Sequence, residues 1–181
     1  MKEIEVKAKL KDPDFMMNKL KDLGCEFSEP IVQKDKIFLE KNEDFLNVNS
    51  ERNVFRIREQ NGKFILTLKK AQSNELDCIE RETVIEDAEQ IKDMLTYLGY
   101  KEFVRYSKKR KKCKYKEYEI CLDEVDELGT FIEVERMSED DASKIQEELL
   151  KFLLSLGIEK EDMIVKGYDT MIFKQKGEIN E

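Results

Sequence analysis

Acidic and basic side chains alternate with apolar ones in EIEVK, close to the start of this chain. In an extended strand, successive side chains point to opposite faces. Glu3, Glu5 and Lys7 then share one face, while Ile4 and Val6 share the other. Carboxylates bind hard divalent cations and ammonium groups bind anionic oxygens. A strand of this kind could therefore position both a metal ion and a phosphate group.

The same alternation puts doublets of like charge on one face of several later segments. The doublets are Arg56 with Arg58, Lys108 with Arg110, Glu80 with Glu82, and Glu133 with Glu135, and two further pairs are Thr67 with Lys69 and Cys121 with Asp123. A single charged strand face is most often a solvated surface. Repetition across strands favours a closed sheet with its charged faces inward. Burying so many charges is costly, so such a barrel must hold water and a strongly charged ligand.

The chemistry of the two charge sets indicates what that ligand is. Arginine makes forked contacts to phosphate oxygens and lysine supplies a point charge, so the basic set suits an anion with several phosphates: Lys7, Arg56, Arg58, Lys69, Lys108 and Arg110. The acidic set offers oxygen ligands, which select Mg2+ or Mn2+: Glu3, Glu5, Asp123, Glu133 and Glu135. Because a divalent cation can join carboxylates to phosphates, the sequence predicts a metal–triphosphate site in a charged tunnel.

Residue types that are absent or isolated exclude other chemistry. The chain has no histidine, which excludes a Ser-His-Asp triad and a histidine general base. Its four cysteines have no CxxC spacing, so a zinc site of the usual kind is not expected. We expect reduced thiols in a cytoplasmic protein. Catalysis must then depend on carboxylates, lysine, arginine, tyrosine or a hard metal ion.

Length and charge limit the classes of partner. The 181 residues favour a single domain spanning residues 1–181. The formal net charge of -8 argues against nucleic acid as a partner. No apolar run reaches the roughly 20 residues of a membrane helix, and the N-terminus has no signal-peptide pattern. We therefore expect no membrane association.

The elements that must position these residues follow from hydrophobic periodicity. Three amphipathic helices are expected over residues 12–24, 87–99 and 139–157, each ending in Leu-Gly. Between them the period changes to two, and about eight strands are expected, a number that can close into a small barrel. They lie in EIEVKAKL, IVQKDKIFL, NVFRIREQ, KFILTLKK, DCIERETVI, EFVRYSKKRKKCKY, YEICLDEV and TFIEVERM. The segment EKNEDFLNVNSE and the polar tail after about residue 174 are expected to be flexible.

These motifs together resemble the CYTH, or triphosphate tunnel metalloenzyme, superfamily. Glu3, Glu5 and Lys7 match its ExExK signature, and the similarity continues in order through FRIR, LTLKK, SKKR, CLDEVDELGTFIEVE and GYDTMIF. The chain is most similar to the CyaB-type class IV adenylate cyclases, especially in EIEVKAKL and LDEVDELGTFIEVE. Thiamine triphosphatases and inorganic triphosphatases share the fold and most of the site.

The resemblance implies an α+β fold in which eight antiparallel strands form a barrel, the triphosphate tunnel, with amphipathic helices packed outside. It implies that Glu3, Glu5 and Glu133 bind a catalytic Mg2+ or Mn2+, that Glu135 is a second acid and that Asp123 lies near a second metal. Glu3, Glu5 and Lys7 are accordingly the expected catalytic residues, and the six basic residues are the expected triphosphate-binding positions. Tyr168 is expected to pack rather than to take part in chemistry.

Several functions fit this pattern. A class IV adenylate cyclase would direct the ribose 3′-hydroxyl of ATP at the α-phosphorus and release pyrophosphate, whereas a triphosphatase would direct water at the terminal phosphorus. A non-catalytic polyphosphate or nucleotide sensor would keep the tunnel without the chemistry. A plain α+β module with solvated charges is the fourth interpretation. The partner expected in the first three cases is a small-molecule triphosphate, and relatives of this kind are often homodimers.

Overall fold

The computed structural model describes residues 2–41 and 53–178. Most of the segment expected to be flexible before the third strand therefore lies outside the described residues. The eight expected strands are all present and pair antiparallel: β1 (Lys2–Lys9), β2 (Ile31–Glu40), β3 (Asn53–Gln60), β4 (Lys63–Ala71), β5 (Asp77–Ile85), β6 (Tyr100–Tyr115), β7 (Tyr118–Val125) and β8 (Gly129–Ser138). The α+β class is confirmed.

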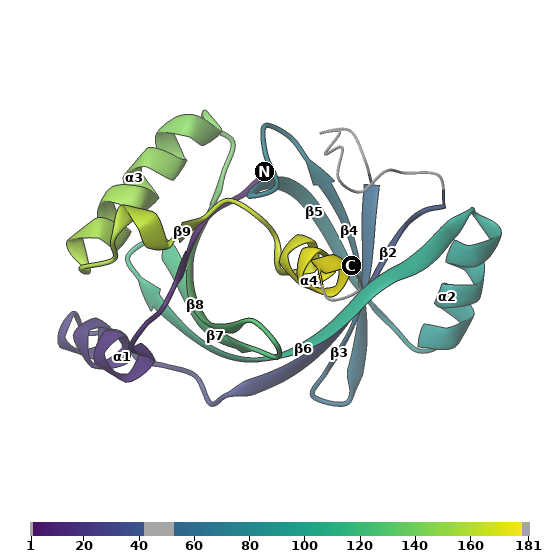
Figure 1. The fold of residues 1–181 in the computed structure, drawn as a ribbon, viewed down its shortest axis with the longest axis horizontal. Coiled ribbons are helices and arrows are strands. Elements are labelled where there is room, and N and C mark those ends of the chain that lie inside the picture. Colours follow the sequence, from purple (N-terminus) through teal and green to yellow (C-terminus); the bar gives the residue numbers. More distant parts are fainter. Residues whose placement is uncertain (1, 42–52, 179–181) are drawn as a thin grey trace.

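Pairing between the first and fifth strands closes the sheet into a barrel. The strand order runs β5-β4-β3-β2-β6-β7-β8-β1, and β1 pairs with β5 through Glu3 opposite Cys78 and Ile4 opposite Asp77. Figure 1 shows these strands curving round into one ring. A two-residue strand that was not expected, β9 (Met163–Ile164), adds to β1.

The three expected helices form, and each begins with an aspartate cap. They are α1 (Pro13–Asp22), α2 (Ala88–Tyr97) and α3 (Ala142–Ser155). The carboxylates of Asp12, Asp87 and Asp141 accept hydrogen bonds from backbone N–H groups of the first turn, which satisfies donors that have no partner within the helix.

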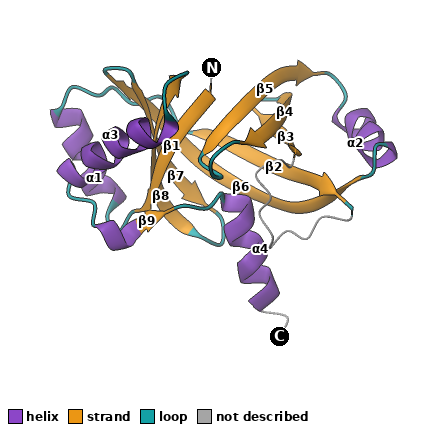
Figure 2. Cartoon of the chain, turned by 90° about the horizontal axis from the view of Figure 1, so that it is seen from above, coloured by secondary structure: helices purple, strands orange, loops and turns teal. Residues whose placement is uncertain are grey.

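A fourth helix, α4 (Tyr168–Glu178), was not predicted from the sequence. It includes the start of the polar segment after residue 174, for which flexibility stays a prediction. In Figure 1 α4 lies within the outline of the ring of strands, and Figure 2, turned by 90°, shows it projecting from one end of the barrel. Tyr168 and Ile172 of this helix are buried against Val125 and Phe131 of the barrel.

The apolar outer faces of the strands are covered by the other three helices. Leu20 of α1 and Leu149 of α3 belong to one core cluster with Ile4 and Ile132 of the barrel. Leu95 of α2 packs with Phe38 and Ile57 on the opposite side. Since one face of each strand is used in this way, the alternate face must point into the barrel.

Among the described residues, no helix combines the length and apolarity needed to cross a bilayer.

Candidate active site

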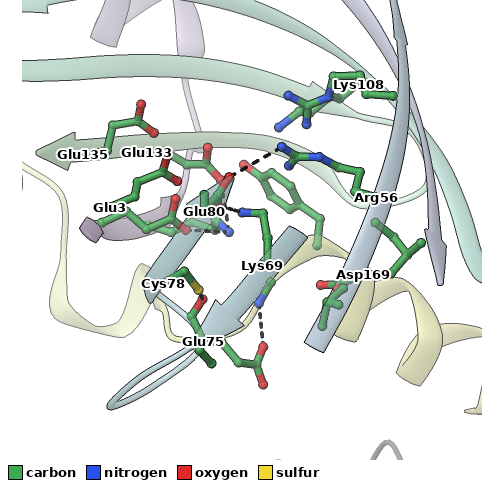
Figure 3. Close-up of a pocket in the computed structure, with 18 of the residues that line it drawn as sticks. Glu3, Arg56, Lys69, Glu75, Cys78, Glu80, Lys108, Glu133, Glu135 and Asp169 are labelled. Carbon is green, nitrogen blue, oxygen red and sulfur yellow. Dashed lines mark hydrogen bonds and ion pairs between the residues drawn. The ribbon is translucent and has the colours of Figure 1, made fainter. Parts of the chain in front are cut away.

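The charged strand faces meet in one cavity inside the barrel. Ten of the eleven predicted site residues line it, and only Asp123 does not: the ten are Glu3, Glu5, Lys7, Arg56, Arg58, Lys69, Lys108, Arg110, Glu133 and Glu135. Figure 3 shows Glu3, Glu133 and Glu135 gathered on one side of this space, with Arg56 and Lys108 facing them from the other. The charged faces therefore point inward, as the alternation predicted, and several of the acids and bases inside the barrel are paired with one another.

Strand register explains why the acids are so close together. In the ladder between β1 and β8, Glu5 lies directly opposite Glu135 and Lys7 lies opposite Glu133. Like charges directly opposite each other destabilise a sheet. The Glu5–Glu135 pair therefore indicates a place where a cation is needed.

A group of carboxylates meets the geometric requirement for a divalent cation. One oxygen from each of Glu3, Glu5 and Glu135 lies within 4.8 Å of the others. Burial, together with the charges of Glu80 and Glu5, raises the pKa of Glu3 to about 7, and burial and neighbouring carboxylates also raise the pKa values of Glu5 and Glu135. The three carboxylates offer only oxygen ligands, and their raised pKa values show that they ionise less readily when no cation is near them. Both properties fit a site for Mg2+ or Mn2+.

A second grouping adds a thiol. Ligand atoms of Cys121, Glu133 and Glu135 also lie within 4.8 Å of one another. Burial raises the pKa of Cys121, however, and the thiolate rather than the thiol is the metal ligand. The oxygen-only set is therefore better suited to a hard ion.

Glu133 has a different electrostatic environment from the other acids. Burial opposes its ionisation, but Lys7 and Arg110 outweigh that effect and hold the pKa of Glu133 well below its usual range. The Lys7 ammonium lies 3.0 Å from Oε1 of Glu133, and Arg110 donates to Oε2. Glu133 is thus an ionised carboxylate at the boundary between the acidic and basic sides.

The arginines of the basic side are held by buried carboxylates. Arg58 donates through Nε and Nη2 to the two oxygens of Asp35, at 2.7 and 2.8 Å. Arg110 donates through Nε to Asp123 at 2.7 Å, and the Lys108 ammonium donates to the same carboxylate at 3.2 Å. Asp123 was predicted among the metal ligands, but the structure places it behind the cavity wall as a partner of two cations.

Tyr168 connects helix α4 to this arrangement. Its hydroxyl donates to Asp123 at 3.0 Å, and its ring lies 4.1 Å from the Lys7 ammonium and 4.9 Å from that of Lys108. The ring also packs against Phe131, as expected. Cation–π contacts of this kind favour a fixed position of the charged group, so Tyr168 orients two lysines as well as filling space.

Several residues that face the site were not assigned to it from the sequence. They are Asp35 and, lining the cavity, Glu75, Glu80, Glu82, Tyr106, Lys112 and Asp169. Glu80 and Glu82 were visible as a like-charge doublet and could have been included on that signal. Glu75 and Asp169 lie outside the strands, in a loop and in α4, where alternation gives no information.

The raised pKa of Glu3 predicts how stability depends on pH without metal. Between the ordinary value of 4.5 and about 7, the folded protein binds more protons than the unfolded chain, so the free energy of unfolding falls as pH rises through this window. We expect the melting temperature of metal-free protein to fall from about pH 5 to pH 8, measured by differential scanning fluorimetry. Glu3→Gln should show a shallower decline. A melting temperature that rises over the same range would contradict this prediction.

Comparison with known families and curated proteins matches nearly the whole chain. The CYTH domain family matches residues 1–168. A Methanocaldococcus jannaschii protein named "Putative adenylate cyclase MJ0240" is 32% identical over 172 residues, which cover 93% of this chain and 97% of the relative. "Adenylate cyclase CyaB" of Aeromonas hydrophila is 23% identical over 171 residues, covering 93% and 87%.

Solved structures show the same fold. PH1819 from Pyrococcus horikoshii OT3 superposes with a TM-score of 0.79 at 29% identity, over 96% of this chain and 99% of that one. HpAC1 from Hippeastrum, described as having a dominant triphosphatase activity, superposes with a TM-score of 0.61 at 19% identity, over 97% and 96%. The second likeness concerns the fold alone.

Proposed function

This chain belongs to the CYTH domain family, and from that premise we propose that it is a metal-dependent enzyme acting on a triphosphate held inside the barrel. The specific activity that we propose is that of a class IV adenylate cyclase, which converts ATP to cyclic AMP and pyrophosphate. One observation carries the proposal: a cluster of three carboxylates and all six predicted cations line the same cavity. The names of the two curated relatives agree with it.

We propose that Glu3, Glu5 and Glu135 hold Mg2+ or Mn2+, with the ionised Glu133 beside them. When bound there, the ion would supply Lewis-acid stabilisation of phosphate oxygens and lower the pKa of the attacking hydroxyl. The carboxylates favour this ion over softer metals because they offer only oxygen ligands.

The basic residues bind and orient the triphosphate in this proposal. Asp35 fixes the guanidinium plane of Arg58 from behind, which leaves the phosphate-binding geometry preorganised. Burial alone would lower the pKa of Lys7, but the neighbouring carboxylates of Glu133 and Glu5 raise it above its ordinary value. Lys7 therefore remains a cation and contributes charge and position rather than acting as a general base.

The alternative is a triphosphatase that hydrolyses inorganic triphosphate, thiamine triphosphate or a nucleoside triphosphate. The same residues would bind the phosphates, and water would replace the ribose hydroxyl as the nucleophile. The observation that favours keeping this alternative is the triphosphatase activity described for the Hippeastrum protein, which shares the fold. A non-catalytic sensor is less well supported, because binding an anion alone does not require the carboxylate cluster.

Product analysis tests these functions directly. Purified protein would be incubated with Mg2+ or Mn2+ and, in parallel, with ATP, thiamine triphosphate and tripolyphosphate. Cyclic AMP with pyrophosphate would support the cyclase, and inorganic phosphate would support the triphosphatase. Metal-dependent thermal stabilisation by tripolyphosphate without turnover would support the sensor. The absence of both turnover and stabilisation would refute a triphosphate-binding function.

Arg58→Ala is expected to weaken tripolyphosphate binding roughly 10- to 100-fold, because a buried hydrogen bond to a charged group is lost. Isothermal titration calorimetry in the presence of Mn2+ would measure the change. Arg105, which is exposed on the outer face of β6 and pairs with Glu102, provides a matched control, and Arg105→Ala should bind normally. Equal affinities for both variants would remove Arg58 from the binding site.

We further propose that residues 1–181 form one domain, since β1 at one end of the chain pairs with β8 and β9 near the other. The four free cysteines support a reducing, cytoplasmic location. A homodimer is the proposed assembly, and light scattering coupled to size-exclusion chromatography would test it.

A further inference from the structure

The cavity that would bind a polyanion is lined by at least as many carboxylates as cations. Seven lysine and arginine side chains and eight glutamate and aspartate side chains face it. Most of the cations therefore already have an anionic partner from the chain itself. A phosphate chain entering the cavity must compete with any such partner that faces the same space.

These partners differ in how accessible they are to a ligand and to solvent. Asp35 and Asp123 have fully buried side chains and do not line the cavity, so they brace the cations from behind and are not in the path of a ligand. Glu82 on β5 lines the cavity and its side chain is 49% exposed. It is therefore a carboxylate that a ligand can displace into solvent.

Glu82 is hydrogen-bonded to one edge of the Arg56 guanidinium group. Nη2 of Arg56 donates to Oε1 of Glu82 at 2.8 Å, and the hydroxyl of Thr67 donates to the same oxygen at 2.9 Å. Glu80 is more distant, at 3.7 Å from Nη2, and is paired with Lys69. Glu82 is thus the nearest anion to this guanidinium.

Arg56 also retains unused hydrogen-bonding capacity. It is 7% exposed, and its buried Nε has no hydrogen-bond partner among the described residues. A buried donor without a partner is unfavourable. Since Arg56 faces the cavity, an anionic oxygen from a ligand could accept a hydrogen bond from Nε. A ligand bound there would compete with Glu82 for the adjoining Nη2.

We propose that Glu82 is a built-in competitor for the phosphate chain, which occupies the Arg56 subsite in the ligand-free protein and is displaced when a triphosphate binds. This inference rests on the proposed function and names a residue that sets affinity. Glu82 lowers the affinity for every anion that reaches Arg56, pyrophosphate product included. Removing its charge should therefore tighten binding without creating any new contact.

Calorimetry with tripolyphosphate, in EDTA and again with saturating Mn2+, tests this. Glu82→Gln should bind tripolyphosphate about two- to fivefold more tightly than wild type, the range expected for a partly exposed ion pair. The matched control is Glu59→Gln, which removes the same charge from the outer surface, where Glu59 is 44% exposed and pairs with Lys34. The affinity of Glu59→Gln for tripolyphosphate should equal that of wild type, because solvent and salt screen the charge at this position.

Two outcomes would overturn the inference. Glu82→Gln could bind tripolyphosphate no more tightly than Glu59→Gln does, or it could bind it more weakly than wild type. Glu82→Ala, which removes the side chain altogether, provides a second variant, and thermal unfolding would confirm that each variant is folded. If wild-type protein fails to bind tripolyphosphate even with Mn2+, the proposed function itself fails; if only the variants disagree, that function stands.

Discussion

Glu5→Gln is expected to reduce turnover at least about a hundredfold, because a metal ion in such a site contributes several kcal/mol of charge stabilisation. Glu5 belongs to the carboxylate cluster with Glu3 and Glu135. Glutamine keeps the shape of the side chain but loses the charge that holds the ion. Steady-state kinetics on the identified substrate, together with Mn2+ titration by calorimetry, would measure both effects.

A second readout separates this loss from a folding defect. Burial and the neighbouring Glu133 raise the pKa of Glu5, so removing its charge should leave the melting temperature of metal-free protein unchanged or higher. The stabilisation by Mn2+ should decrease at the same time. Glu89→Gln, at an exposed ion pair on α2, should behave like wild type. Wild-type turnover and undiminished Mn2+ binding in Glu5→Gln would refute the metal assignment.

The eight strands and their orientation could be predicted, because the alternation of apolar and charged residues is compatible with only one arrangement of the two strand faces. Each strand needs an apolar face for the helices outside, so the charged face could only point inward once the sheet closed. In β1, Ile4 and Val6 enter the outer core, and this places Glu3, Glu5 and Lys7 in the cavity. The contents of the cavity were therefore determined by the same alternation that determined the fold.

Helix α4 was missed for a physical reason. Its N-terminus is held largely by Glu75, in the loop before β5, although the carboxylate of Asp169 also accepts a hydrogen bond from the backbone N–H of Thr170. The Glu75 carboxylate accepts hydrogen bonds from the backbone N–H of Gly167 and from the Thr170 hydroxyl, and pairs with Lys166. A cap from more than ninety residues away leaves no signal in the local sequence.

The pairing of charges inside the cavity could not be predicted either. Sequence identifies an acid and the face that it shares, but its neighbours depend on strand register. Asp123 lies opposite Arg110 in the ladder between β6 and β7, whereas Glu135 lies opposite Glu5. Two acids that look alike in sequence therefore have different partners, a cation in one case and another acid in the other.

Asp123→Asn is expected to destabilise the protein by about 3 kcal/mol, because it leaves buried cations without their counter-ion. The carboxylate is fully buried and contacts Arg110, Lys108 and the Tyr168 hydroxyl. Burial opposes its ionisation, but Lys108 and Arg110 outweigh burial and lower the pKa of Asp123. Its contribution is present at neutral pH and is lost as pH falls below about 4. Urea denaturation at pH 7 and at pH 3 would measure the difference between variant and wild type.

The same variant distinguishes bracing from metal binding at this position. If Asp123 acts by holding Arg110 and Lys108, the loss of stability should persist in EDTA, and Mn2+ stoichiometry should not change. Asp93→Asn, on the exposed face of α2, should leave stability unaltered and controls for the change in net charge. A variant of normal metal-free stability that binds one Mn2+ fewer would instead assign Asp123 to the metal, as the family resemblance first implied. Three donors on one buried carboxylate argue for the bracing role, because they use the oxygens that an ion would need.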